Sequence, residues 1–230
     1  MNFPEKTFFI NIHTHKTFYS ESEFALLNIF AQEYKTYKIN CGYAYSVGLH
    51  PWHVKKDLIK PALDEIEHAA KESFVAAIGE TGLDRAIEIE LRLQEEAFIA
   101  QLEIAEKLRK PVLLHAVRSY SDMIAIRKKN RFTTPWIFHG YTGNLIIAKQ
   151  LIDLNCYLSF GKFLLNSKSN VPDLFIELPK EHIFLEIDDS NLTIQEVYRQ
   201  ASFLKACDIR EIQATILNNF NRCFFNGKNR

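Results

Sequence analysis

Histidine and carboxylate side chains recur at one kind of position in this 230-residue sequence, directly after short apolar runs. The apolar residues 8–10, for example, lead within a few positions to a His-Thr-His stretch. Six of the eight histidines follow such runs, namely His13, His15, His50, His53, His115 and His139. Acidic residues follow two further runs, namely Glu80, Asp84, Glu186, Asp188 and Asp189. Imidazole and carboxylate groups bind divalent metal ions, so the pattern indicates a metal site.

Residue spacing supports this interpretation for two pairs. Side chains two positions apart on a strand point to the same side, so His13 and His15 share a face, as do Glu186 and Asp188. Each residue taken alone also has a structural explanation. Asp188, for example, could cap a helix that begins near Asn191. The metal interpretation therefore depends on the number of these residues and on their common position.

The apolar runs that precede these residues are predicted to be buried strands. Each is short, rich in β-branched or aromatic residues and poor in polar alternation, as in parallel strands covered by helices on both faces. The predicted strands span residues 7–13, 43–50, 74–79, 111–117, 136–139, 156–160 and 183–187. Amphipathic stretches between them predict helices at residues 21–34, 87–110, 144–154, 191–207 and 211–225.

Alternating strands and helices predict an α/β fold with right-handed crossover connections. Two architectures fit, an open doubly wound sheet and a (β/α) TIM-type barrel. An open nucleotide-binding sheet would have a glycine-rich turn after its first strand, whereas this sequence has His-Thr-His-Lys there. In a barrel, the carboxyl ends of all strands meet at one mouth, where barrel enzymes have their active sites. The polar residues therefore favour the barrel, formed by a single domain over residues 1–230.

Composition sets limits on partners and location. The formal net charge is zero, which argues against a broad non-specific nucleic-acid surface but allows a local phosphate site. The four cysteines, Cys41, Cys156, Cys207 and Cys223, lack metal or disulfide spacing, so we expect reduced thiols in a cytoplasmic protein. No apolar run has the length of a membrane span or the context of a signal peptide. We expect a monomer without an obligate protein partner.

The same residues carry a resemblance to the TatD family of metal-dependent hydrolases, which extends over essentially the whole chain. NIHTH, VGLHPW and AIGETGLD are similar to the family motifs D-x-H-x-H, G-x-H-P and G-E-x-G-L-D. PVLLHAVRS, FHGYTG, YLSFG, LEIDDS and ILNNFNRCF resemble further family segments and follow in the family's order. The motif G-E-x-G-L-D is the most specific of the set.

The resemblance implies a distorted (β/α) barrel, with the eighth strand the weakest, that holds two divalent ions such as Mg²⁺, Mn²⁺ or Zn²⁺. The implied metal ligands are His13, His15, Glu80, His115, His139 and Asp188. His50 would lie near the substrate or beside the ligands. Asn11 stands where the family usually has aspartate, and we expect this difference to affect metal affinity or substrate preference.

The implied ligand set suits hydrolysis by a metal-activated water. Glu80 would bridge the two metals, one of which takes the histidines of NIHTH and the other His115 and His139. Asp188 would be the general base and later the proton donor. Glu80 and Asp188 are therefore the predicted catalytic residues.

The resemblance favours hydrolysis of DNA phosphodiesters, as in 3′-5′ exodeoxyribonucleases. Arg85 and Arg118 could hold phosphates, and Tyr141 could stack on a base. Trp52 and Phe163 are further candidates for stacking, although Trp52 could equally pack in the core. Two alternatives stay open: hydrolysis of a small-molecule or aminoacyl ester or amide at the same metal site, which the zero net charge favours, and a metal-binding protein without catalysis.

Overall fold

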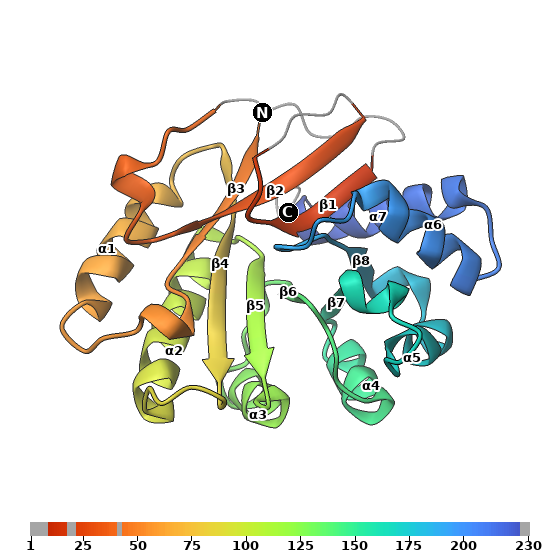
Figure 1. Cartoon of the computed structure of the whole chain (residues 1–230). Coiled ribbons are helices and arrows are strands. Elements are labelled where there is room, and N and C mark those ends of the chain that lie inside the picture. The colour runs from red at the N-terminus through yellow and green to blue at the C-terminus, as the bar shows by residue number, and fades with distance from the viewer. Residues whose placement is uncertain (1–8, 18–21, 41–42, 226–230) are drawn as a thin grey trace. The chain divides into compact units, whose positions relative to one another are not determined.

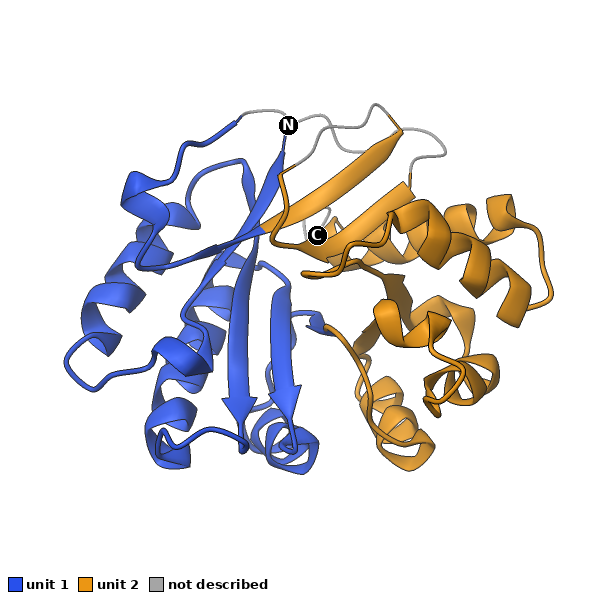
Figure 2. Ribbon diagram, in the orientation of Figure 1, with its two compact units in different colours: residues 1, 28–138 blue, residues 2–27, 139–230 orange. Residues whose placement is uncertain are grey.

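The computed structural model of the chain describes residues 9–17, 22–40 and 43–225. These residues form two compact units (Figure 2). Unit 1 comprises the described residues from 28 to 138, and unit 2 comprises those up to 27 and from 139 onward. Unit 2 therefore contains both ends of the described chain. The boundary at residue 28 falls within a strand.

Eight strands belong to one sheet in chain order, and α-helices separate the strands from the third onward (Figure 1). The strands are β1 (Phe9–Thr14), β2 (Glu23–Phe30), β3 (Ala44–Gly48), β4 (Val75–Asp84), β5 (Val112–Val117), β6 (Trp136–Phe138), β7 (Tyr157–Phe160) and β8 (Ile183–Leu185). Parallel pairs join β3, β4, β5 and β6 in unit 1, and join β1 to β2 and β7 to β8. The predicted (β/α)-barrel class is confirmed.

The α-helices are α1 (Ile59–Ala69), α2 (Leu91–Leu108), α3 (Tyr120–Asn130), α4 (Leu145–Asp153), α5 (Val171–Glu177), α6 (Ile194–Leu204) and α7 (Ile209–Phe224). Short 3₁₀ turns occur at Tyr34–Thr36, Pro51–His53, Lys162–Leu165 and Lys180–His182. Helix α6 begins with a capping box formed by Thr193 and Glu196. Because Thr193 is the cap, the alternative role of Asp188 as the cap of this helix is wrong.

The prediction of a helix at residues 21–34 is wrong, because the centre of this segment is the strand β2. Phe24, Leu27 and Phe30 have helical spacing, but Leu26 and Ile29, which lie between them, are fully buried. A segment that is apolar on both faces suits a parallel strand, and β2 pairs with β1. The strand that the sequence pattern fails to show is therefore the second in the chain.

Two further expectations concern the thiols and the membrane. Cys156, Cys207 and Cys223 are free thiols, and Cys41 lies outside the described residues. Among the helices of the described ranges, none combines the length and apolarity needed to cross a membrane. The assignment of residues 1–230 to a single domain stays a prediction.

Candidate metal centre

Glu80 lies inside β4, so the predicted strand end at residue 79 is too early. Gly79 and Gly82 flank it, and both have positive φ angles, +132° and +147°. A Cβ atom at Gly82 would lie 2.0 Å from the carbonyl oxygen of His115, so only glycine allows β4 to approach β5 this closely. The GETGLD motif is therefore strand, and its glycines keep Glu80 beside the neighbouring strand.

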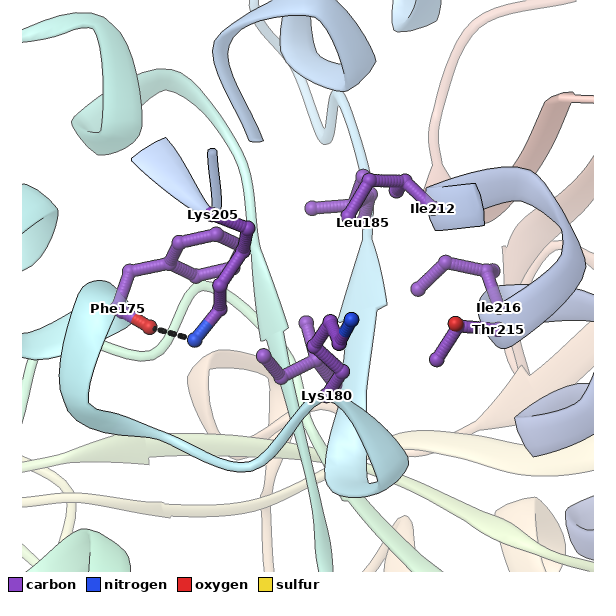
Figure 3. A pocket seen from close by; sticks show the side chains of 8 residues that line it. Phe175, Lys180, Leu185, Lys205, Ile212, Thr215 and Ile216 are labelled. Atoms are coloured by element: carbon purple, nitrogen blue, oxygen red, sulfur yellow. Dashed lines mark hydrogen bonds between the residues drawn. The ribbon is translucent and has the colours of Figure 1, made fainter. Parts of the chain in front are cut away.

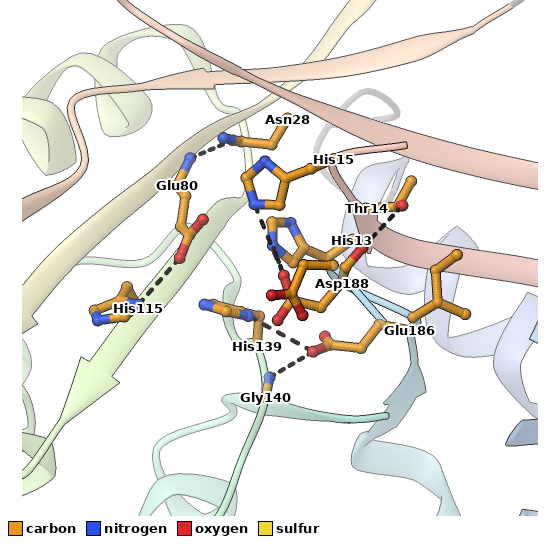
Figure 4. A network of polar contacts seen from close by, with 12 residues as sticks. His13, Thr14, His15, Asn28, Glu80, His115, His139, Gly140, Glu186 and Asp188 are labelled. Carbon is orange, nitrogen blue, oxygen red and sulfur yellow. Dashed lines mark hydrogen bonds and ion pairs between the residues drawn. The ribbon is translucent and has the colours of Figure 1, made fainter. Parts of the chain in front are cut away.

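The Glu80 carboxylate is buried among polar groups of unit 1 (Figure 4). Its Oε1 lies 3.1 Å from His115 Nδ1 and 3.2 Å from His50 Nε2. The backbone N–H of Glu80 donates to Asn28 Oδ1 at 2.6 Å, and Asn28 Oδ1 also accepts from Ser46 Oγ at 3.0 Å. The two imidazoles offset part of the cost of removing the carboxylate from water, and Asn28 holds the backbone of Glu80.

A second carboxylate, Asp84 at the end of β4, contacts the other nitrogen of His115. Asp84 Oδ2 lies 3.0 Å from His115 Nε2 and accepts from Trp52 Nε1 at 2.8 Å. Burial alone would raise the pKa of Asp84, but hydrogen bonds from Trp52, Ala86 N–H and His115 outweigh it, so the pKa lies below its usual value. An ionised Asp84 fixes the orientation of the imidazole, as carboxylates beside metal-binding histidines do.

In unit 2, the end of β1 is joined to the segment after β8. Asp188 N–H donates to the His13 carbonyl at 3.1 Å, and Thr14 Oγ1 donates to the Asp188 carbonyl at 3.1 Å. Asp188 has a φ angle of +52°, in the left-handed region that aspartate tolerates better than most residues with a side chain. The backbone of this connection therefore places Asp188 beside the histidines of β1.

The imidazoles of His13, His15 and His139 gather around the Asp188 carboxylate (Figure 4). Asp188 Oδ1 lies 3.4 Å from His13 Nε2 and 3.7 Å from His15 Nε2. The His13 ring is 4.9 Å from that of His15 and 4.4 Å from that of His139, measured between centroids. His13 and His15 thus contribute to one cluster, as their spacing predicts.

Glu186 lies beside His139 in the same unit. Its side chain is almost fully buried, and Oε1 accepts from Gly140 N–H at 2.7 Å and lies 3.6 Å from His139 Nδ1. Within the described ranges, Glu186 Oε2 has no hydrogen-bond partner. This carboxylate therefore lies beside His139, at a longer distance than the 3.0 Å between Asp84 and His115.

Each unit brings together side chains that fit a divalent ion. The two sets are His50, Glu80 and His115 in unit 1, and His13, His139 and Asp188 in unit 2. Within each set, one donor atom per residue lies within 4.8 Å of the others. Mixed imidazole and carboxylate donors suit zinc and manganese, and carboxylates also suit magnesium.

Five of the six predicted metal ligands belong to these two sets, and the sixth, His15, lies beside Asp188 of the second set. Glu80 and His115 belong to the set of unit 1, and His13, His139 and Asp188 form that of unit 2. His50, predicted near the substrate or beside the ligands, contacts Glu80 directly. The predicted bridge through Glu80 and the predicted pair of His115 with His139 join residues of different units and stay predictions.

The predicted substrate-binding residues have different outcomes. Tyr141 is 1% exposed and its hydroxyl donates to the Asn144 carbonyl at 2.9 Å, so its predicted stacking on a base is wrong. Arg85 forms two hydrogen bonds to the Asp122 carboxylate, at 2.7 and 2.8 Å. Arg118 is exposed, and its contact with phosphate stays a prediction.

Asn11, which stands where the resemblance implies aspartate, is fully buried in unit 2. Its Oδ1 accepts from Ile187 N–H at 3.2 Å, and its Nδ2 donates to Glu23 Oε1 at 3.0 Å. Burial raises the pKa of Glu23, and the hydrogen bond from Asn11 partly opposes this. An ionised aspartate at position 11 has no hydrogen to donate, so asparagine matches the carboxylate on β2.

Three polar residues of the clusters are not among the site residues predicted from the sequence, although Asp84 and Glu186 belong to the acidic pattern after the apolar runs. Asp84 and Glu186 contact histidines, and Asn28 holds the backbone of Glu80. Asp84 and Glu186 each stand close in sequence to a predicted ligand, which is a usable signal. Asn28 offers none, because it lies in the segment whose pattern predicts a helix.

Comparison with known proteins shows the family of this chain. The family model described as TatD related DNase matches residues 13–225. The uncharacterized metal-dependent hydrolase YcfH of Escherichia coli K12 is 26% identical over 196 residues, which cover 78% of this chain and 73% of YcfH. The 3′-5′ ssDNA/RNA exonuclease TatD of Edwardsiella piscicida is 27% identical over 162 residues, which cover 66% of this chain and 60% of that protein.

Structural similarity points the same way. The crystal structure of YJJV, a TatD homologue from Escherichia coli K12, has a TM-score of 0.76 at 22% identity, with 87% of this chain and 86% of that chain covered. This likeness shows a common fold. Because the family model spans nearly all of the described residues, the chain belongs to the TatD family of metal-dependent hydrolases.

Proposed function

We propose that the protein is a divalent-metal-dependent phosphodiesterase that shortens DNA from its 3′ end. The observation that carries the proposal is a pair of imidazole–carboxylate clusters, one in each unit. Within each cluster, the donor atoms lie within 4.8 Å of one another. Membership in a family of hydrolases supports it, and one relative is named as a 3′-5′ ssDNA/RNA exonuclease.

The proposed cofactor is a pair of divalent ions, Mg²⁺, Mn²⁺ or Zn²⁺. Its proposed ligands are His13, His15, Glu80, His115, His139 and Asp188. When bound, such ions lower the pKa of water and neutralise negative charge that develops on the attacked phosphate. Asp84 and Glu186 would keep the imidazoles of His115 and His139 in the orientation that binding requires.

Asp188 is the proposed general base. Its side chain is 25% exposed, so the carboxylate can reach a water molecule while Oδ1 faces the histidines of β1. Lys162 Nζ lies 4.0 Å from Asp188 Oδ2 and 2.9 Å from Asp189 Oδ1, so a positive charge stands beside this carboxylate. Asp188 would accept a proton from the attacking water and then donate it to the leaving oxygen.

The proposal is tested by incubating the protein with single-stranded DNA labelled at its 5′ end, in the presence of each ion in turn. We expect a ladder of products that shorten from the 3′ end, and release of a mononucleotide when the label is at the 3′ end instead. The variant Asp188→Asn, purified in parallel, controls for contaminating nucleases. Hydrolysis of ester or amide substrates without shortening of DNA in any metal would contradict the proposal.

A further inference from the structure

Unit 1 contains a cavity of about 460 Å³ between the end of β2, the turn Pro51–His53 and α1. Its volume is within the range of small-molecule binding sites. Residues that line it include Lys35, Leu49, Trp52, His53, Lys55 and Leu58.

Trp52 connects this cavity to the Glu80–His115 cluster. Its indole N–H donates to Asp84 at 2.8 Å, and its backbone N–H donates to His50 Nδ1 at 3.2 Å. The indole ring lies 4.9 Å from the His50 ring and 6.1 Å from the His115 ring, measured between centroids. Even so, Trp52 is 59% exposed. An aromatic ring that is held by hydrogen bonds and still exposed is a pre-organised surface for stacking.

The charged residues of the cavity favour an anionic ligand. Lys35 and Lys55 contribute two positive charges, and Glu65, which pairs with Lys35 at 2.9 Å, contributes one negative charge. The lining is therefore net positive beside an aromatic and partly apolar wall. A nucleotide combines the two complementary features, a flat base and a phosphate.

We propose that this cavity binds one nucleotide of a single-stranded nucleic acid, with its base stacked on Trp52 and its phosphate near the lysines. The inference rests on the proposed function, because it makes the cavity a subsite for the substrate of the same metal centre. It also assigns base stacking to Trp52 in place of Tyr141, which is buried.

The cavity of unit 2 shown in Figure 3 does not provide such a subsite. Its volume of about 10 Å³ is that of a single water molecule. Lys205 Nζ, which lines it, donates to the carbonyl oxygens of Phe175 and Ile176, the latter at 3.0 Å. These bonds satisfy carbonyls at the end of α5, so this lysine has a structural role.

Tryptophan fluorescence tests the proposal directly. The chain has two tryptophans, and Trp136 is fully buried, so quenching by a ligand reports on Trp52. The whole protein, kept metal-free by a chelator, is titrated with a short oligothymidylate, thymidine monophosphate, ribose 5-phosphate and inorganic phosphate. We expect saturable quenching by the two ligands that carry a base, and no change in the variant Trp52→Phe. Equal quenching by ribose 5-phosphate, or none by the oligonucleotide, would overturn the proposal.

Fluorescence anisotropy of a labelled oligonucleotide measures the affinity of the variants. Trp52→Leu should bind about tenfold more weakly or worse, and Trp52→Phe should retain most of the affinity because it keeps a ring. Phe203→Leu is the matched control, since it removes a 78% exposed aromatic residue from α6 in unit 2 and should leave binding unchanged. Affinity of Trp52→Leu equal to that of the unchanged protein would overturn the proposal.

The binding experiment separates this inference from the proposed function. The chelated protein has no metal for hydrolysis, so binding is measured without catalysis. Loss of binding in Trp52→Leu together with absent DNA shortening by the metal-loaded protein would support the subsite and reject the nuclease activity. DNA shortening by the metal-loaded protein, with unchanged affinity in Trp52→Leu, would support the nuclease activity and reject the subsite.

Discussion

Asp188 combines an unusual backbone conformation with a position among three imidazoles. Its φ angle of +52° is maintained by hydrogen bonds to the end of β1, at His13 and Thr14. A residue other than glycine in the left-handed backbone region costs conformational energy. Such residues occur where surrounding contacts compensate this cost, which is often the case at active sites. Asp188→Asn, which removes the charge and keeps nearly the same shape, is therefore an informative variant.

For Asp188→Asn, we expect kcat to fall by roughly 10²- to 10⁴-fold, because the amide cannot accept the proton of the attacking water. Asparagine tolerates positive φ, so the fold and most of the metal content should be kept. The measurement is kcat on labelled DNA together with elemental analysis of the bound metal. Full activity in a variant that retains its metal would refute the role of Asp188 as general base.

Asn11 allows a second test at the scale of single residues. Asn11→Asp would place a second carboxylate beside that of Glu23 in a buried site, where repulsion and desolvation lower the free energy of unfolding by roughly 1–3 kcal/mol. The double variant Asn11→Asp with Glu23→Gln restores a donor facing an acceptor and should recover most of the loss. Urea unfolding of the two single variants and the double variant measures this coupling. Simple additivity of the two changes would contradict it.

At the scale of elements, β4 is the strand on which the cluster of unit 1 depends. It carries Glu80 and Asp84, and its pairing with β5 brings Gly82 opposite His115. Helix α2 supports the next connection, because Glu106 accepts hydrogen bonds from the turn before β6, the strand that leads to His139. Each of these supports can be removed by one substitution.

Gly82→Ala should lower the free energy of unfolding by about 2 kcal/mol or more, because the new Cβ meets the His115 carbonyl and the φ angle is unfavourable for alanine. Gly140→Ala is the matched control. Its φ angle is also positive, but the nearest atom to a Cβ there lies 3.6 Å away, so about 1 kcal/mol is expected. Thermal or urea unfolding of both variants gives the comparison, and equal losses would argue against the close approach at Gly82.

The lowered pKa of Glu106 predicts that the stability of the protein depends on pH. Burial raises its pKa, but hydrogen bonds from Thr134 and Thr133 outweigh burial and hold the pKa below its usual value. A carboxyl with a lowered folded-state pKa adds stability above its unfolded-state pKa and loses it as the pH falls through the folded-state value. Glu106→Gln should therefore cost about 1 kcal/mol at neutral pH, and the difference should shrink below about pH 4. Urea unfolding across this pH range is the measurement, and a constant difference would contradict the prediction.

At the scale of the whole molecule, each unit contributes its own set of metal-binding side chains. The strands of this (β/α) barrel follow one another in the sheet in chain order, and most of these residues lie at or just after strand ends. Metal binding and folding should then be linked, because ligands of a buried ion are brought together only in the folded chain.

Removal of metal should abolish hydrolysis and lower the melting temperature. An ion present at 100 times its dissociation constant stabilises the folded state by about 2.7 kcal/mol. We therefore expect the melting temperature of the chelated protein to rise with the logarithm of added Mn²⁺ or Zn²⁺, and activity to return with it. Differential scanning calorimetry across a metal titration measures the effect. A melting temperature independent of metal would contradict binding at these clusters.

Much of this protein was predictable from its sequence, because the relevant patterns are local. Apolar runs of strand length predict seven of the strands, and the polar residues after them indicate a metal site. The motif G-E-x-G-L-D pointed to the family because its glycines and carboxylates stand at fixed spacing in one strand. Local patterns of this kind can be recognised in the sequence without knowledge of tertiary contacts.

Only the tertiary structure decided the features that depend on distant partners. Residues 23–30 form a strand because they are covered on both faces, which helical spacing alone cannot reveal. Tyr141 and Trp52 are both aromatic residues near strand ends, yet packing buries the first and exposes the second. Asn11 acquires its role from Ile187, 176 positions away in sequence. Burial and hydrogen bonding are properties of the folded neighbourhood, and a sequence pattern records that neighbourhood only where it is also local.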